Sequence, residues 1–151
     1  MKRFTSQTQQ IGEIGEHIAC KYLIKQGFQV LERNYTKKIG EIDIVCTKDS
    51  VIHFVEVKSI VTRVTGLNQS NVSRRRSADE AGETSKNVEL YNPFENITRH
   101  KLRKLWRTIE WYLAERRVSR ETRWQIDAIA VVLNYNTRIA NVNVLWNVVD
   151  C

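Results

Sequence analysis

Residues 40–58 read Gly-Glu-Ile-Asp-Ile-Val-Cys-Thr-Lys-Asp-Ser-Val-Ile-His-Phe-Val-Glu-Val-Lys, and this stretch decides the fold. β-Branched and aromatic residues dominate it, which indicates two strands joined by a tight turn at Asp49-Ser50. A hairpin centred on this turn places Asp43 directly opposite Glu56. Both faces of the hairpin are largely apolar, so we expect it to lie in a sheet that is covered on both sides.

The charged residues of this hairpin alternate onto one face, as Glu41, Asp43, Glu56 and Lys58. The same register places Glu41 opposite Lys58. Two opposed carboxylates repel each other, and their partial removal from water must be offset by a cation. Lys58 offsets part of this cost, and Mg²⁺, which prefers a few carboxylate oxygens, would offset more. The alternative is an ordinary solvated strand face with a Glu41–Lys58 ion pair.

Further elements are expected on both sides of the hairpin. Apolar residues at helical spacing predict a helix over residues 11–26, ended by Gly27. A second helix is predicted from an N-cap at Thr98 to about residue 117. Because helical spacing places Trp106 on its apolar stripe, we expect Trp106 and Trp111 in the core or at an interface rather than as platforms for base stacking. The predicted strands cover residues 28–34, 41–47, 51–60, 124–134 and 141–149, with Ile42 and Ile44 on the face opposite Asp43. This pattern predicts an α/β fold with a central mixed β-sheet flanked by helices.

One segment, at about residues 66–91, differs in composition from the rest of the 151-residue chain. It is rich in Ser, Asn, Arg and Glu and has too few apolar residues to build a core. We therefore expect a single domain, residues 1–151, that carries a mobile polar insertion. The arginines at 74–76 are interpreted as a solvated charge run, with phosphate contact as the alternative.

The overall charge favours a polyanionic partner. Lys and Arg outnumber Asp and Glu by 24 to 17, which gives a net charge of +7 and a pI of about 9.5. Nucleic acid and an anionic membrane surface both fit this charge. The chain shows neither a membrane-spanning apolar run nor a signal peptide, and its 3 cysteines suit neither a disulfide framework nor a zinc site. We expect a cytoplasmic protein with no membrane partner.

The order of the motifs resembles the Asp…Glu-x-Lys signature of the restriction-endonuclease-like nuclease superfamily, which includes the archaeal Holliday junction resolvases. Gly40-Glu41-Ile42-Asp43 followed by Glu56-Val57-Lys58 carries the resemblance. More narrowly, the chain is similar to the YraN family of small bacterial predicted endonucleases. The supporting motifs are Gly12-Glu13-Ile14-Gly15-Glu16, Gly27-Phe28, Glu32-Arg33-Asn34-Tyr35, Asn92-Pro93-Phe94-Glu95 and Ile126-Asp127. The match covers nearly the whole chain, and the insertion is the departure from it.

The resemblance implies a restriction-endonuclease-like fold and a metal-dependent endonuclease that hydrolyses phosphodiester bonds. It implies DNA as the substrate rather than RNA, with branched or junction DNA as one form. Asp43 and Glu56 would bind Mg²⁺ or Mn²⁺, the Val57 carbonyl would add a ligand, and Lys58 would orient or activate the attacking water. Relatives that act on junctions work as two subunits that make symmetric cuts, so the resemblance leaves a homodimer as an alternative to a monomer.

In the resolvase relatives a carboxylate from the first helix completes the site, and Glu13 and Glu16 are the candidates here. Helical geometry places Glu16 at the border of the apolar face of the helix and Glu13 on the solvent-exposed face. We therefore choose Glu16 as the catalytic residue. The alternative is a favourable charge near the helix N-terminus. Two further carboxylates are not assigned. Glu41 either belongs to the catalytic site or only pairs with Lys58. Asp127 either belongs to the catalytic site or is a buried polar residue that supports it.

The second helix is strongly basic near its start. Its nucleic-acid-binding candidates are Arg99, Lys101, Arg103 and Lys104. Such residues can hold phosphates together with the amides of a helix N-terminus, and a solvated helix face is the alternative. The competing functions are a non-cleaving nucleic-acid-binding or assembly protein on the same fold and a basic protein-interaction module.

Overall fold

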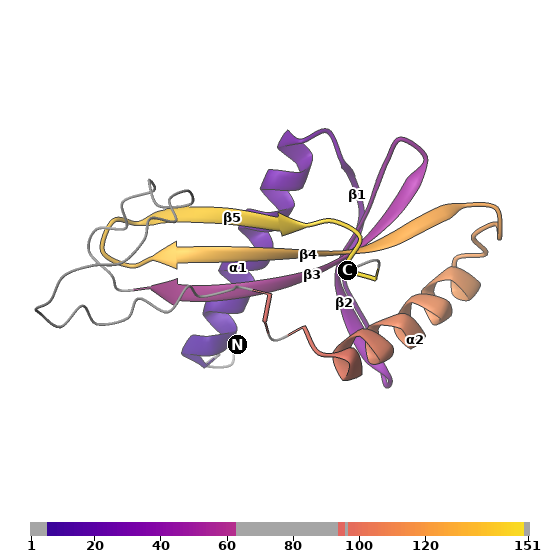
Figure 1. Ribbon diagram of the computed structural model, residues 1–151, viewed down its shortest axis with the longest axis horizontal. Helices are drawn as coiled ribbons and strands as arrows, with labels where there is room; N and C mark the ends of the chain where they lie inside the picture. The colour runs from indigo at the N-terminus through magenta and orange to yellow at the C-terminus, as the bar shows by residue number, and fades with distance from the viewer. Residues whose placement is uncertain (1–5, 63–93, 96, 150–151) are drawn as a thin grey trace, which may run out of the picture.

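The computed structural model describes residues 6–62, 94–95 and 97–149. Its elements are α1 (Gln7–Lys25), β1 (Gln29–Lys37), β2 (Gly40–Lys48), β3 (Val51–Thr62), α2 (Arg99–Glu115), β4 (Arg123–Asn134) and β5 (Ile139–Leu145). The strands form one five-stranded sheet in the order β1-β2-β3-β4-β5, in which only β3 and β4 are parallel. Helix α1 crosses one face and α2 lies against the other beside β2 (Figure 1). The predicted α/β class with a mixed sheet flanked by helices is confirmed.

The β2–β3 hairpin has the predicted register. Ile44 pairs with Val55, and Lys48 pairs with Val51. The two-residue turn at Asp49-Ser50 has φ values of 48° and 62°. Positive φ at both central positions is the pattern of a type I′ turn, whose twist matches that of the flanking strands. Asp-Ser is only a weak turn signal in the sequence. The register is nevertheless fixed, because only one register buries the apolar residues of both strands.

Beyond Ile44, strand β2 leaves β3 while remaining paired with β1 as far as Gly40 (Figure 1). Asn34 of β1, next to this point, has a left-handed backbone with φ 52°. The β1–β2 register is the same at Arg33–Ile44 and at Tyr35–Ile42, and the register shift of this ladder lies between Val30 and Glu32. The expectation that Ile42 shares a face with Ile44 is wrong, because Ile42 packs in the α2-side core and Ile44 in the α1-side core.

Helix α1 begins earlier than predicted, after an N-cap at Ser6. The Ser6 hydroxyl accepts a hydrogen bond from the Gln9 amide and the Gln9 side chain accepts one from the Ser6 amide, which completes a capping box. The apolar face of α1 packs over β3 and the neighbouring strands, with Leu23 fully buried. Among the described residues no helix combines the length and the apolar character that crossing a membrane requires.

Helix α2 begins as predicted after Thr98, whose hydroxyl accepts a hydrogen bond of 3.3 Å from the Lys101 amide. Leu105 and Ile109 enter the core beneath it. Trp106 was expected in the core or at an interface, yet it is 40% exposed. It lies at the border of the helix face, where one part of the ring contacts Trp124 and the rest reaches solvent.

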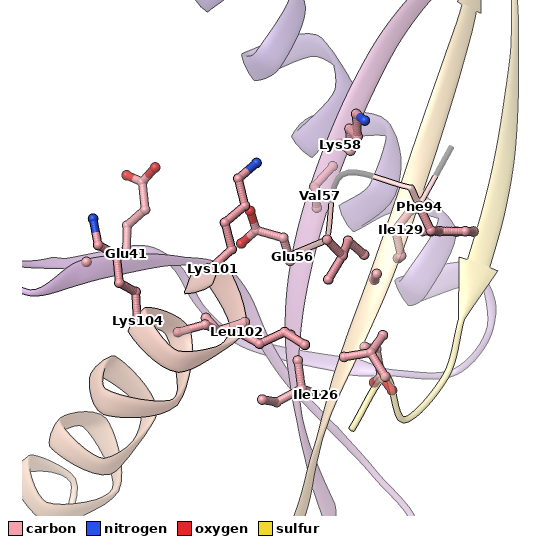
Figure 2. A pocket seen from close by; sticks show the side chains of 16 residues that line it. Glu41, Glu56, Val57, Lys58, Phe94, Lys101, Leu102, Lys104, Ile126 and Ile129 are labelled. Atoms are coloured by element: carbon pink, nitrogen blue, oxygen red, sulfur yellow. The ribbon is translucent and has the colours of Figure 1, made fainter. Parts of the chain in front are cut away.

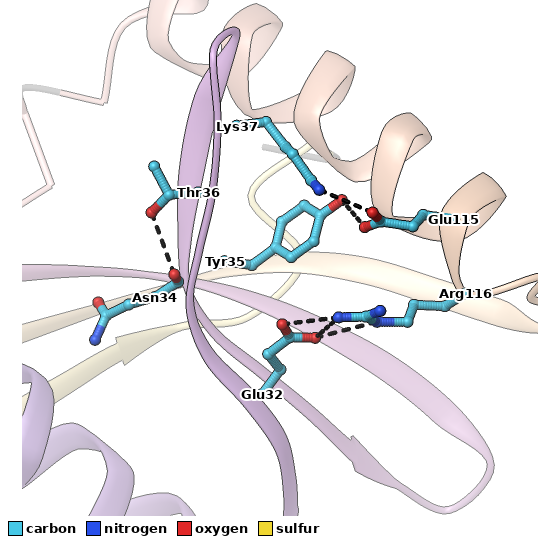
Figure 3. Close-up of polar contacts among 7 residues, drawn as sticks. All are labelled: Glu32, Asn34, Tyr35, Thr36, Lys37, Glu115 and Arg116. Atoms are coloured by element: carbon cyan, nitrogen blue, oxygen red, sulfur yellow. Dashed lines mark hydrogen bonds and ion pairs between the residues drawn. The ribbon is translucent and has the colours of Figure 1, made fainter.

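Polar contacts fasten the C-terminal end of α2 to strand β1 (Figure 3). The hydroxyl of buried Tyr35 donates a hydrogen bond of 2.6 Å to Glu115, and Lys37 donates one of 2.8 Å to the same carboxylate. Arg116 pairs with Glu32 at 2.8 Å. Exposed ion pairs contribute little singly, but together with the buried Tyr35 they fix the helix against the β1–β2 hairpin.

The remaining boundaries agree with the sequence analysis to within a few residues, except at the last strand. Strand β5 ends at Leu145 rather than at residue 149. The segment after it turns back, and the amide of Val148 donates a hydrogen bond of 2.8 Å to the Ile126 carbonyl. The predicted insertion at 66–91 lies outside the described residues.

Candidate active site

Asp43 occupies the point where β2 and β3 separate. Its side chain turns into the gap, where the Oδ2 atom accepts a hydrogen bond of 2.7 Å from the backbone amide of Val57. After Val55, strand β3 is no longer paired with β2, so the Asp43 carboxylate accepts the hydrogen bond that a backbone carbonyl of β2 would otherwise accept. Asp43 is only 8% exposed. A carboxylate held this way is desolvated on most sides and keeps lone pairs for a cation.

Glu56 of β3 is close enough to Asp43 for the two charges to interact. The expected direct pairing of Asp43 with Glu56 in the ladder is wrong, because the β2–β3 pairing ends at Ile44 and Val55. Burial, followed by the charge of Glu56, raises the pKa of Asp43 to about 8, although the hydrogen bond from the Val57 amide acts in the opposite direction. Burial also raises the pKa of Glu56, whereas the ammonium of Lys101 lowers it. The charges of Glu16 and Glu41 add to the rise in both pKa values. Desolvation and like charge therefore act together against ionisation of this pair.

Glu16 reaches this group from helix α1. It is half-buried, whereas Glu13 is exposed. The helix begins at Gln7, so Glu16 lies well beyond the first turn and the alternative explanation by a charge at the helix N-terminus does not apply. Gly15 explains how Glu16 approaches the site, because a Cβ added at Gly15 would lie 1.7 Å from the Ser59 hydroxyl oxygen of β3. Close backbone approach at Gly15 places the next residue at the sheet.

A cavity of about 330 Å³ opens between β3, β4 and α2 next to these carboxylates. Glu56 and Lys58 face it from β3, while Lys101 and Lys104 face it from α2 (Figure 2). The Nζ atom of Lys58 is buried. Glu41 lines the same cavity, but the expected direct pairing of Glu41 with Lys58 across the ladder is wrong, because β2 and β3 have already separated there.

Gly40 and Thr108 hold the hairpin against α2 at the rim of this cavity. A Cβ at Gly40 would approach the Thr108 hydroxyl oxygen to 2.8 Å. The buried Thr108 hydroxyl donates a hydrogen bond of 3.0 Å to the Lys104 carbonyl within the same helix. The glycine that opens the Gly-Glu-Ile-Asp motif thus permits close contact between the hairpin and α2.

The donor set fits a hard divalent cation with water in its open positions. Across residues 6–62, 94–95 and 97–149, no three His, Cys, Asp or Glu side chains are arranged to hold a metal ion by themselves. Mg²⁺ does not need such a cage, since it is commonly held by one or two carboxylates and keeps several waters. Asp43 and Glu56 supply this number, and the pKa values of both are raised chiefly by burial, a cost that a bound cation would offset.

Asp127, which was left undecided, also lines this cavity, but its carboxylate is held by His53, Gln125 and Asn147, none of which lines the cavity. Its buried carboxylate lies 2.6 Å from Nδ1 of His53 and accepts hydrogen bonds from the Gln125 side chain at 2.7 Å and from the Asn147 amide at 2.8 Å. It therefore anchors the segment that follows β5. The sequence analysis found no role for His53, because a contact between residues 74 positions apart has no local signal.

Comparison with known proteins gives a consistent assignment. Residues 15–131 match the model of a family described as "Uncharacterised protein family UPF0102", which is the YraN family. A UPF0102 protein of Campylobacter fetus subsp. fetus is 36% identical over 129 residues, covering 85% of this chain and 89% of the relative. A UPF0102 protein of Campylobacter jejuni subsp. doylei is 36% identical over 120 residues, covering 80% of this chain and 81% of the relative. The matched region includes the Asp43 and Glu56 strands and helix α2. The chain belongs to the UPF0102 (YraN) family.

Proposed function

We propose that this protein is a metal-dependent endonuclease that hydrolyses phosphodiester bonds in DNA. The observation that carries the proposal is the burial of Asp43 and Glu56 side by side, with raised pKa values, in the gap between β2 and β3. A protein that only binds nucleic acid gains nothing from burying two like charges. A site that binds Mg²⁺ or Mn²⁺ needs this arrangement, because the ion offsets the cost.

Glu56, Val57, Lys58, Lys101 and Lys104, which line the cavity, and Asp43, which lies beside Glu56, each have a place in this reaction. Asp43 and Glu56 would hold the metal, with the Val57 carbonyl as a further ligand. The metal would lower the pKa of a bound water and neutralise charge on the phosphate oxygens. Lys58 would orient the attacking water at the cavity wall, and Lys101 and Lys104 would bind the phosphate that enters between α2 and β3.

The proposal is tested by incubating labelled linear, flapped and four-way-junction DNA, and matched RNA, with the protein in Mg²⁺, Mn²⁺ or EDTA. We expect cleavage in the presence of metal, no cleavage in EDTA, and loss of cleavage in the Glu56→Gln variant. Glu56→Gln keeps the size of the side chain and removes the metal-binding charge. Salt-sensitive binding without cleavage by the wild-type protein would favour the non-cleaving nucleic-acid-binding protein instead.

The role of the first helix is tested by a matched pair of variants. We expect Glu16→Gln to lower the cleavage rate by about 10- to 100-fold, the range seen when groups that support metal ligands are lost. Glu13→Gln, three residues earlier on the exposed side of α1, is expected to cleave at the wild-type rate. Equal rates for the two variants would remove Glu16 from the site.

A further inference from the structure

Helix α2 borders two hollows that share part of their lining. One is the carboxylate cavity, which Lys101 and Lys104 face. The other, of about 450 Å³, is lined by Arg99, Arg103, Trp106 and Val149. Leu102, Ile126 and Val148 line both. In Figure 2, Leu102 and Ile126 lie at the end of the carboxylate cavity away from Lys58.

The basic residues of α2 thus fall into two groups, which the sequence analysis treated as one. Arg99, Arg103 and Trp106 follow one another along a single helix stripe, because residues four and three positions apart share a face. The Cα atoms of Arg99 and Arg103 are about 6 Å apart along the helix axis. Arginine binds phosphate oxygens in a planar, two-pronged manner, which suits successive phosphates of a nucleic acid strand.

Trp106 is a rigid and accessible ring within the second hollow. Its Nε1–H donates a hydrogen bond of 3.2 Å to Glu110, and Trp124 packs against it with a centroid separation of 4.8 Å and an interplanar angle of 60°. The ring nevertheless remains 40% exposed. An aromatic ring fixed before binding loses little conformational entropy when a base stacks on it.

We propose that this second hollow binds an unpaired nucleotide of the substrate strand, next to the bond that is cleaved. The inference rests on the proposed function and names its substrate as nucleic acid with a single-stranded segment at the cleavage site. Arg99 and Arg103 bind phosphates of that segment, and Trp106 stacks on one of its bases. Bases within a duplex are already stacked on their neighbours, so only an unpaired base offers a free ring face to Trp106.

The test measures binding separately from cleavage. Labelled single-stranded DNA, blunt duplex DNA and duplex DNA with a single-stranded overhang are titrated with protein in EDTA, and the dissociation constants are obtained by fluorescence anisotropy. Trp106→Ala is expected to weaken binding of the single strand and the overhang about tenfold. Binding of the blunt duplex stays unchanged, and Trp106→Phe, which keeps a ring, retains most of the affinity.

Two controls lie on the same helix. Trp111 is a second exposed tryptophan, 56% exposed, and it lines neither hollow, so Trp111→Ala should bind every DNA as the wild type does. Arg107→Gln removes a charge outside both hollows and serves as the control for Arg103→Gln. Thermal unfolding of each variant reports whether it is folded.

The outcomes separate this inference from the proposed nuclease activity. If Trp106→Ala binds the overhang as tightly as the wild type, or loses affinity equally for all three DNAs, the nucleotide subsite is wrong, whether or not the protein cleaves. If Trp106→Ala selectively loses single-stranded DNA while the wild type shows no cleavage with any metal, the subsite stands and the nuclease proposal fails.

Discussion

Replacing Asp43 with asparagine is expected to lower metal-dependent cleavage on the order of 1,000-fold and at the same time to stabilise the metal-free protein. Asparagine keeps an oxygen that can accept the hydrogen bond from Val57 and removes a negative charge beside Glu56. The two effects have opposite signs because the charge that binds the metal is the charge that burial opposes.

The expected pH dependence follows from the direction of the shift. The pKa of Asp43 rises from 3.8 in the unfolded chain to about 8 in the folded protein. The associated stability is fully present below about pH 4 and is lost as the pH rises through about 8. In EDTA the wild-type protein should therefore become less stable between these limits. Asp43→Asn should flatten this decline, with a gain in unfolding free energy of a few kcal/mol at about pH 8.

Chemical denaturation in EDTA at several pH values measures this effect, and adding Mg²⁺ provides the second half of the test. Mg²⁺ should stabilise the wild type increasingly as the pH rises, because the metal competes with the proton on Asp43. It should have little effect on Asp43→Asn. Glu13→Gln is the control, since this exposed carboxylate lies away from the site. A variant less stable than the wild type at high pH in EDTA would show that Asp43 is structural rather than a metal ligand.

The β2–β3 hairpin was predictable because its information is local. Alternation of apolar residues and a short turn fix the partner of every residue between Ile44 and Val55, and the structure has that register. The start of α1 was also predictable from local sequence, because Ser6 followed three residues later by Gln9 is a capping-box sequence. Local signals thus account for the elements and for the proximity of Asp43 and Glu56.

The separation of β2 from β3 could not be predicted in the same way. The hairpin alone predicts a continuous ladder in which Glu41 meets Lys58, whereas the β2–β3 pairing ends at Ile44 and Val55. Beyond that point Gly40 of β2 lies against Thr108 of α2, a contact between segments distant in the sequence that has no local signal.

The close contact between α1 and β3 leads to the largest expected effect on stability. A Cβ at Gly15 would lie 1.7 Å from the Oγ and 2.8 Å from the Cβ of Ser59. Rotation of the Ser59 side chain can move its Oγ but not its Cβ, which is attached to the backbone of β3, so the contact at 2.8 Å remains. We expect Gly15→Ala to lower the unfolding free energy by about 2–3 kcal/mol through overpacking, despite the better helix propensity of alanine.

Gly12 provides a matched control three residues earlier in the same helix. A Cβ there meets no atom within 4 Å. Gly12→Ala should therefore stabilise the protein by up to about 1 kcal/mol, since only the helix propensity changes. Urea denaturation of the two variants compares the same substitution in the same helix, with opposite signs expected. Destabilisation by both would mean that α1 tolerates no added methyl group, irrespective of Ser59.

Removing the Ser59 side chain then connects this packing with the site. In the double variant Gly15→Ala, Ser59→Gly the new methyl group occupies the space of the lost side chain, so stability should recover relative to Gly15→Ala after allowance for glycine in a strand. Gly15 also places Glu16 beside Asp43 and Glu56, whose pKa values respond to its charge. Cleavage that recovers together with stability would show that Gly15 matters only by letting α1 approach β3. Stability that recovers without cleavage would show that Glu16 must be held to within a fraction of an ångström, because the helix has regained its packing but not its exact distance from the carboxylate pair.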